Sequence, residues 1–95
     1  MHVNITTKDY HLDAKLRSSI ERKIAKLERH YNRITSVHLM LSVTKVNHRA
    51  EASVRVDGNE LFAESVESDM RSAIDALTSK LERQISRHKD KVTRH

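Results

Sequence analysis

The amino-acid sequence predicts an α+β fold with the order βαβββα, in which two amphipathic helices cover one face of a four-stranded antiparallel sheet. In two stretches the apolar residues recur at steps of three and four, which is the period of a helix. In the other stretches they alternate, which is the period of a strand. The 95 residues suffice for one domain of ordinary size and not for two. We therefore expect residues 1–95 to form a single domain.

The first half of the chain contains one short strand, one helix and one longer strand. Val3 and Ile5 alternate with polar residues, which is typical of a strand. Asp13 is a suitable N-cap for a helix that runs to about Asn32. The apolar face of this helix comprises Leu16, Ile20, Ile24, Leu27, Tyr31 and Ile34. The inward side chains of the strand that follows are Val37, Leu39, Leu41 and Val43.

The second half contains two further strands and a long helix. The inward side chains of the first of these strands are Ala50, Ala52, Val54 and Val56. Asp57-Gly58-Asn59 is a hairpin signal, and it leads into a strand whose inward side chains are Leu61, Ala63 and Ser65. Ser68 or Asp69 then caps the last helix. The apolar face of this helix comprises Met70, Ile74, Leu77, Leu81, Ile85 and Val92.

Positive charge is concentrated in the two predicted helices. The chain carries a net charge of +5 and has a pI near 9.8. Residues 13–33 hold seven basic and three acidic side chains, and residues 69–95 hold seven and four. The remaining residues hold four basic and six acidic side chains. A small domain with this distribution is typical of a protein that binds a polyanion.

Within each helix the basic residues form a stripe opposite the apolar face. Successive helical residues are about 100° apart, so Arg22 lies about 200° from Ile20, and Arg83 lies about 200° from Leu81. One stripe comprises Lys15, Arg22, Lys26, Arg29 and Arg33. The other comprises Lys80, Arg83, Arg87, Lys91 and Arg94. One helical turn rises about 5.4 Å, near the spacing of successive phosphates, so we expect both stripes to bind phosphates.

Other interpretations of the stripes are weaker. A charged stripe is often only a solvated surface, but such surfaces normally mix both signs of charge. A membrane surface is disfavoured because the apolar faces contain no Trp and are needed for the core. Nothing marks a recognition helix for DNA, and Phe62 alone is too little for an aromatic RNA-stacking sheet. Two helices on one sheet face instead resemble double-stranded-RNA-binding modules.

We expect no enzymatic activity, no metal and no cofactor. The chain has no cysteine and only one glycine, which excludes thiolate chemistry and a phosphate-binding loop. Its seven histidines lack metal-ligand spacing, and we expect them to be surface residues. Glu60 and Glu64 are expected to balance surface charge. Without a signal-peptide pattern or an apolar stretch of membrane-spanning length, the sequence predicts an intact cytoplasmic protein.

Four segments resemble a known family. They are Lys23-Ile24-Ala25-Lys26-Leu27-Glu28-Arg29, Asp69-Met70-Arg71-Ser72-Ala73-Ile74-Asp75, Leu81-Glu82-Arg83-Gln84-Ile85 and Arg87-His88-Lys89-Asp90-Lys91. Together they resemble the ribosome hibernation promoting factors, also known as sigma-54 modulation proteins or ribosome-associated inhibitors. The likeness covers nearly the whole chain. It departs from the family pattern at Arg71, where an aromatic residue is usual, and this change adds a positive charge.

The resemblance implies a protein that binds the small ribosomal subunit in its decoding channel and blocks messenger and transfer RNA. The implied RNA contacts are Arg22, Lys23, Lys26, Arg29, Lys80, Arg83, Arg87, Lys89 and Lys91. Because the chain ends at His95, the resemblance favours the short form of the family, a monomer when free, without a dimerising domain or C-terminal tail. That form stabilises inactive 100S ribosome dimers with ribosome modulation factor in stress and stationary phase. The alternatives are an inhibitor of single 70S ribosomes and a general binder of structured RNA.

Overall fold

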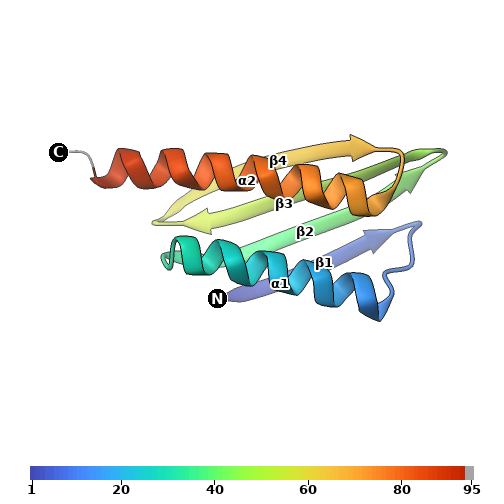
Figure 1. Cartoon of the computed structure of the whole chain (residues 1–95), viewed down its shortest axis with the longest axis horizontal. Helices are drawn as coiled ribbons and strands as arrows, with labels where there is room; N and C mark the ends of the chain where they lie inside the picture. Colours follow the sequence, from blue (N-terminus) through green and yellow to red (C-terminus); the bar gives the residue numbers. More distant parts are fainter. Residues whose placement is uncertain (94–95) are drawn as a thin grey trace.

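The computed structural model describes residues 1–93 and has the predicted element order. The elements are β1 (His2–Lys8), α1 (Ala14–His30), β2 (Ile34–Thr44), β3 (Asn47–Val56), β4 (Asn59–Glu67) and α2 (Met70–Thr93). Both helices lie on the same face of the sheet and leave its other face open (Figure 1). The prediction of a four-stranded sheet with two helices on one face is therefore confirmed.

The sheet is mixed, so the expectation of an antiparallel sheet is wrong at one strand. The strand order is β1-β2-β3-β4, and β1 pairs with β2 in parallel, from His2 opposite Ser36 to Lys8 opposite Ser42. The two other pairings are antiparallel. The cause is α1, which carries the chain back along the sheet so that β2 starts at the same end as β1. A helical crossover of this kind joins parallel strands.

The turn between β3 and β4 is the hairpin that the sequence predicts. Val56 pairs with Asn59, which leaves a two-residue loop of Asp57 and Gly58. Both residues have positive φ, 51° and 76°, as a type I′ turn requires. The twist of such a turn matches the twist of the strands, so the loop fixes their register.

Aspartates begin both helices. The Asp13 Oδ1 atom accepts a hydrogen bond from the Leu16 backbone N–H at 2.7 Å, which confirms the predicted N-cap. At the start of α2 the Asp69 Oδ1 atom accepts from the Ser72 backbone N–H at 2.8 Å, so Asp69 and not Ser68 is the cap. Helix α1 ends at His30, earlier than the predicted Asn32, because Tyr31 adopts an extended backbone with φ of −149°.

The core lies between the sheet and the two helices. From residue 16 onward, the side chains that are predicted to face inward are buried, with three exceptions. Val43, Leu61 and Val92 are only partly buried. Ala73 joins them from α2. Strand β1 is less covered because it is an edge strand, and Val3 is exposed there. The outer surface of α1 and α2 is consequently free to carry the charged side chains of the predicted site.

Candidate nucleic-acid interface

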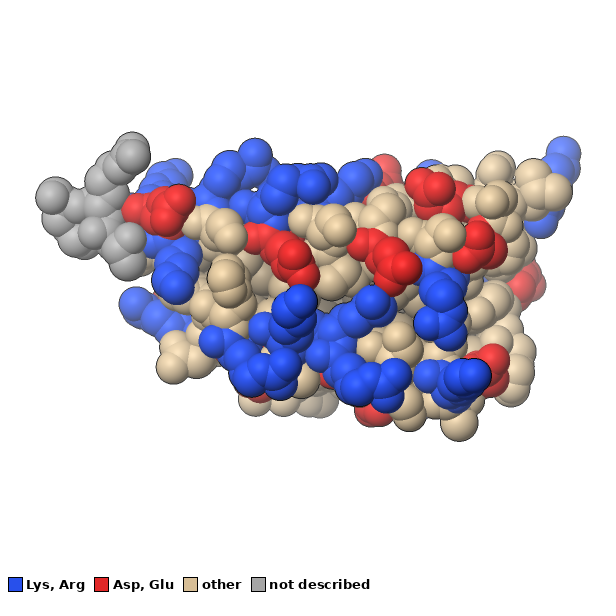
Figure 2. Space-filling view, in the orientation of Figure 1, with Lys and Arg blue, Asp and Glu red and all other residues tan. Residues whose placement is uncertain are grey.

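The helical side of the molecule carries two bands of basic side chains. Figure 2 shows Lys and Arg gathered along each helix, with a row of acidic side chains between the two gatherings. We call Arg22, Lys23, Lys26 and Arg29 the α1 band. We call Lys80, Arg83, Arg87, Lys89 and Lys91 the α2 band. The two bands run beside each other because α1 and α2 lie on the same face of the sheet (Figure 1).

Most of the α1 band is available to a ligand. Arg22, Lys26 and Arg29 are exposed, and they form no ion pair within residues 1–93. Lys23 differs from them, because its Nζ atom lies 2.8 Å from the Asp75 Oδ1 atom of α2. This ion pair joins the two helices and places Lys23 between them. The sequence stripe does not distinguish Lys23 from its neighbours in this respect.

The α2 band begins at the edge of the sheet. The Lys80 Nζ atom donates a hydrogen bond to the Glu64 carbonyl oxygen of β4 at 2.7 Å. One turn later the Gln84 Nε2 atom donates to the Phe62 carbonyl oxygen at 2.9 Å. These two hydrogen bonds occupy carbonyl groups of β4 at the open edge of the sheet. Lys80 is therefore an edge cap as well as a member of the α2 band.

Arg83 and Arg87 follow Lys80 along the same side of α2. They line an open hollow of about 470 Å³ together with Lys80, Gln84 and residues 62–64 of β4. Neither arginine forms an ion pair among the residues that the structure describes. Lys89 and Lys91 continue the band toward the end of the helix. The predicted stripe residue Arg94 lies outside the described residues.

A cluster around Asp57 ties the end of α2 to the rest of the fold. The Asp57 Oδ1 atom lies 2.6 Å from the Arg33 Nε atom, and the Asp57 Oδ2 atom lies 2.9 Å from the His88 Nε2 atom. The Tyr31 hydroxyl donates a third hydrogen bond to the same carboxylate. Tyr31 and His88 also contact each other edge to face, with ring centroids 5.8 Å apart. We call these four residues the Asp57 cluster.

The contacts of the Asp57 cluster change its electrostatics. The hydrogen bond from Tyr31, followed by the one from His88, holds the pKa of the Asp57 carboxyl below its ordinary value. The same hydrogen bond raises the pKa of the Tyr31 hydroxyl, because ionisation would place two negative charges together. The His88 side chain is only 11% exposed, so the expectation that the histidines are surface residues is wrong for His88. Arg33, predicted for the basic stripe, is instead engaged by Asp57.

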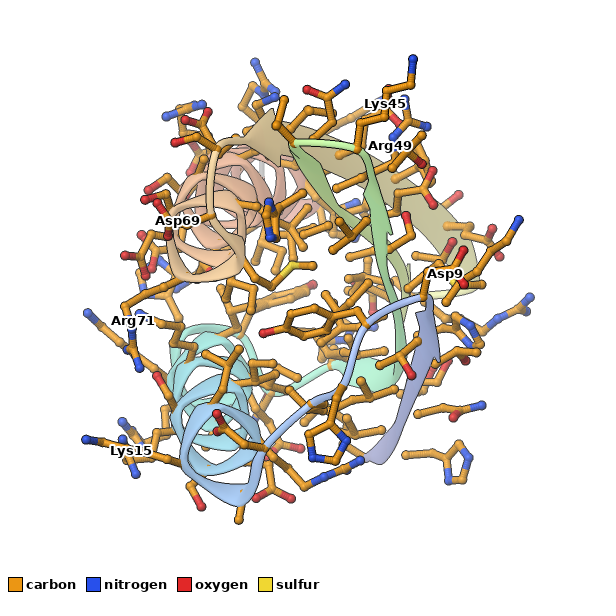
Figure 3. The ribbon with its side chains drawn as sticks, turned by 90° about the vertical axis from the view of Figure 1, so that its right-hand side faces the viewer. Asp9, Lys15, Lys45, Arg49, Asp69 and Arg71 are labelled. Atoms are coloured by element: carbon orange, nitrogen blue, oxygen red, sulfur yellow. The ribbon has the colours of Figure 1, made fainter. Side chains whose placement is uncertain are left out.

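The N-terminal end of α2 accommodates Arg71 without disturbing the core. Figure 3, seen along the helices, shows Arg71 and Lys15 projecting from the helical layer, with Arg49 on the strand side. Met70 and Ala73 on either side of Arg71 are buried, whereas Arg71 is exposed. The helical layer therefore carries one more cation at the N-terminal end of α2.

The site has no other evident chemistry. Within residues 1–93 the structure contains no group of three or more His, Asp and Glu side chains that could hold a metal ion. In the same part of the chain, neither helix is long and apolar enough to cross a membrane. The exposed side chains described above on the helical side are mainly those of Lys and Arg.

Comparison with known proteins agrees with this architecture. The family model of the sigma 54 modulation protein / S30EA ribosomal protein matches residues 3–93. The chain belongs to this family. The ribosome hibernation promoting factor of Escherichia coli K12 is 41% identical over 95 residues, which span the whole of both chains. That of Azotobacter vinelandii is 43% identical over 91 residues, 96% of this chain and 85% of its own length.

Two solved structures have the same fold. A ribosomal subunit interface protein from Coxiella burnetii superposes with a TM-score of 0.88 at 27% identity, covering 94% of this chain and 98% of that one. The N-terminal domain of Thermus thermophilus Protein Y gives a TM-score of 0.83 at 26% identity, with 93% and 99% covered. The chain is thus a homologue of ribosome hibernation promoting factor, in a family that is not enzymatic. The resemblance seen in the sequence is confirmed.

Proposed function

We propose that this chain is a ribosome hibernation factor that binds RNA of the small ribosomal subunit through the α1 and α2 bands. The proposal is supported by a set of exposed cations on one face that form no ion pair within residues 1–93, namely Arg22, Lys26, Arg29, Arg83 and Arg87. Each cation that neutralises a phosphate releases counterions, and this release supplies affinity for RNA. The names of the relatives, a hibernation factor and a subunit interface protein, support the ribosome as the partner.

In this proposal the chain acts as a plug. Residues 1–95 form a single ribosome-binding domain that occupies the decoding channel between the head and the body of the small subunit. There it excludes messenger and transfer RNA, because their phosphates need the same surface. The protein works in the cytoplasm as a monomer, and together with ribosome modulation factor it stabilises inactive 100S dimers in stress and stationary phase.

The stoichiometry of inhibition tests the plug mechanism. A plug silences only the ribosome that it occupies, so inhibition of cell-free translation should saturate near one protein per ribosome. An enzyme that damaged ribosomes would act far below that ratio and would leave cleaved RNA on a gel. Inhibition at a small fraction of the ribosome concentration would therefore contradict the proposal.

Competition tests where the protein binds. Messenger and transfer RNA added before the protein should slow its binding to ribosomes, because the channel is then filled. Equal binding to empty and filled ribosomes would place the protein on another RNA surface. Sucrose-gradient profiles with and without ribosome modulation factor then separate formation of 100S dimers from inhibition of single 70S ribosomes.

A further inference from the structure

The Glu82 carboxylate of α2 has no cation as its partner within residues 1–93. Glu82 lines a hollow of about 170 Å³ between α1 and α2, together with Lys26, Leu27, His30 and Ser86. Within residues 1–93 Glu82 forms neither an ion pair nor a hydrogen bond through its side chain. It is half-buried, whereas Lys26 across the hollow is exposed. The hollow therefore places a carboxylate that forms no ion pair within residues 1–93 between the two basic bands, with Lys26 on the opposite wall.

Asp75 provides the contrast on the same side of α2. Asp75 and Glu82 are seven residues apart, so they lie on nearly the same face of the helix. Asp75 is neutralised by Lys23 of α1 at 2.8 Å, and its presence is explained by that contact. Glu82 has no such explanation, and beside bound RNA its charge would repel phosphates. In the free protein water can hydrogen-bond to the half-buried Glu82 carboxylate, and an uncharged donor of a bound ligand can take the place of that water.

RNA supplies uncharged donors of two kinds. A carboxylate can accept from a base amino group, as Glu and Asp do from the cytosine N4 group, or from a ribose 2′-hydroxyl. The hollow is smaller than the roughly 300 Å³ of pockets that hold whole small molecules, so it admits only the edge of a nucleotide. Lys26 on the opposite wall is placed to bind the phosphate next to that nucleotide.

We propose that Glu82 accepts a hydrogen bond from an uncharged donor of the bound RNA while Lys26 binds a neighbouring phosphate. This inference rests on the proposed function. It adds one contact with an uncharged group of a nucleotide to the phosphate contacts that the two bands make. It assigns to the hollow a role in positioning the RNA strand along the helices. Glu82 then favours binding although it carries the same charge as RNA.

Whether removal of the Glu82 side chain weakens or strengthens RNA binding tests the inference. We expect Glu82→Ala to weaken binding to purified small subunits roughly ten-fold, as the loss of a hydrogen bond to a charged group does. The matched control Asp75→Asn removes one negative charge from the same helix face and releases Lys23, so it should bind equally well or more tightly. Alanine is a strong helix former and Asp75 is exposed, so the circular dichroism of both variants should match that of the wild-type chain. Binding of Glu82→Ala equal to or tighter than wild type would overturn the inference.

Short cytidine oligomers at low salt identify the donor. Weaker binding of Glu82→Ala to both ribo- and deoxyribocytidine decamers would indicate the base amino group. Weakening with the ribocytidine decamer alone would indicate the 2′-hydroxyl, and weakening with neither would contradict the proposal. Failure of the wild-type chain to bind small subunits would overturn the proposed function as well, whereas wild-type binding that Glu82→Ala leaves intact would overturn this inference alone.

Discussion

The helical face and the open sheet face both carry arginines, but within residues 1–93 only those of the helical face lack acidic partners. On the sheet, the Arg49 guanidinium lies 3.6 Å from a Glu51 carboxylate oxygen and 3.5 Å from one of Glu64. Arg55 lies 3.6 Å from Glu60, its direct partner in the β3–β4 register. Both arginines of the sheet face are thus neutralised by neighbouring carboxylates, whereas Lys8 on the same face forms no ion pair within residues 1–93. The number of arginines does not distinguish the two faces, whereas the number of arginines without an ion pair within residues 1–93 does.

The two kinds of secondary structure explain this difference. In an antiparallel pair, residues that face each other come from different strands, so opposite charges can be matched across the ladder. In a helix, residues four apart are neighbours, and Arg22 with Lys26, like Arg83 with Arg87, places two cations side by side. Like charges at this spacing repel each other and destabilise the helix slightly. A bound phosphate would relieve that repulsion.

The largest effect should come from reversing the charge of two cations of the α2 band. Arg83→Glu with Arg87→Glu should weaken binding to small subunits by about a hundred-fold or more, because two phosphate contacts become repulsive. The circular dichroism spectrum should not change, since both side chains are exposed. The matched control is Arg49→Glu with Arg55→Glu on the sheet face, which should change binding only slightly. Retained binding by the first variant would remove the α2 band from the site.

The Asp57 cluster joins the two layers, and acid should weaken it. Because the pKa of the Asp57 carboxyl is lowered, its contribution to the free energy of unfolding is complete above its ordinary value of 3.8. That contribution is lost as the pH falls through the lowered pKa. Asp57→Asn should therefore be less stable than the wild-type chain at neutral pH, and the difference should shrink in acid. Thermal unfolding at several pH values measures this, and a difference independent of pH would contradict it.

A single cation should have a moderate effect that depends on salt. Lys26→Ala should lower the slope of log affinity against log salt concentration by somewhat less than one unit, as expected for one phosphate contact. Arg55→Ala should leave the slope unchanged, since Arg55 is already paired with Glu60. Titrations with small subunits at several salt concentrations measure both slopes. Equal slopes for Lys26→Ala and wild type would show that Lys26 does not contact phosphate.

The smallest effect on binding is expected at Lys80. Its ammonium group already donates to the Glu64 carbonyl oxygen, so Lys80→Ala should weaken RNA binding less than Arg83→Ala does. Loss of the edge cap should also increase self-association, because β4 then presents unpaired carbonyl groups. Sedimentation of the variant at high protein concentration measures this. A loss of binding as large as that of Arg83→Ala would show that Lys80 leaves the sheet edge when RNA binds.

The sequence predicts the elements and the core well because those depend on local periodicity. The apolar residues from Leu16 to Leu27 and from Met70 to Ile85 that are predicted to face inward are buried, and Asp13 caps its helix. The direction of β1 is a different matter, because it depends on the path of the chain through α1. Contacts between distant segments were also missed. Nothing in the local pattern shows that Asp57 meets Tyr31 and His88, or that Lys80 reaches β4.

The sequence places Asp57 in a hairpin turn and Tyr31 and His88 near the C-terminal ends of α1 and α2, but it does not show that these three segments meet. The rotation of each helix about its axis decides which side chains meet, and that rotation is set by packing. The same reason explains why Lys23 pairs with Asp75 whereas Arg22, its neighbour in sequence, forms no ion pair within residues 1–93.

The parallel pairing of β1 with β2 also bears on the order in which the chain folds. Each pair in this ladder joins residues thirty-four positions apart, whereas the β3–β4 hairpin begins with residues only three apart. Closing a long loop costs more entropy than closing a short one, so the hairpins can form early and β1 must wait for α1 and β2. When the complete chain refolds, β1 is therefore expected to dock after the β3–β4 hairpin has formed.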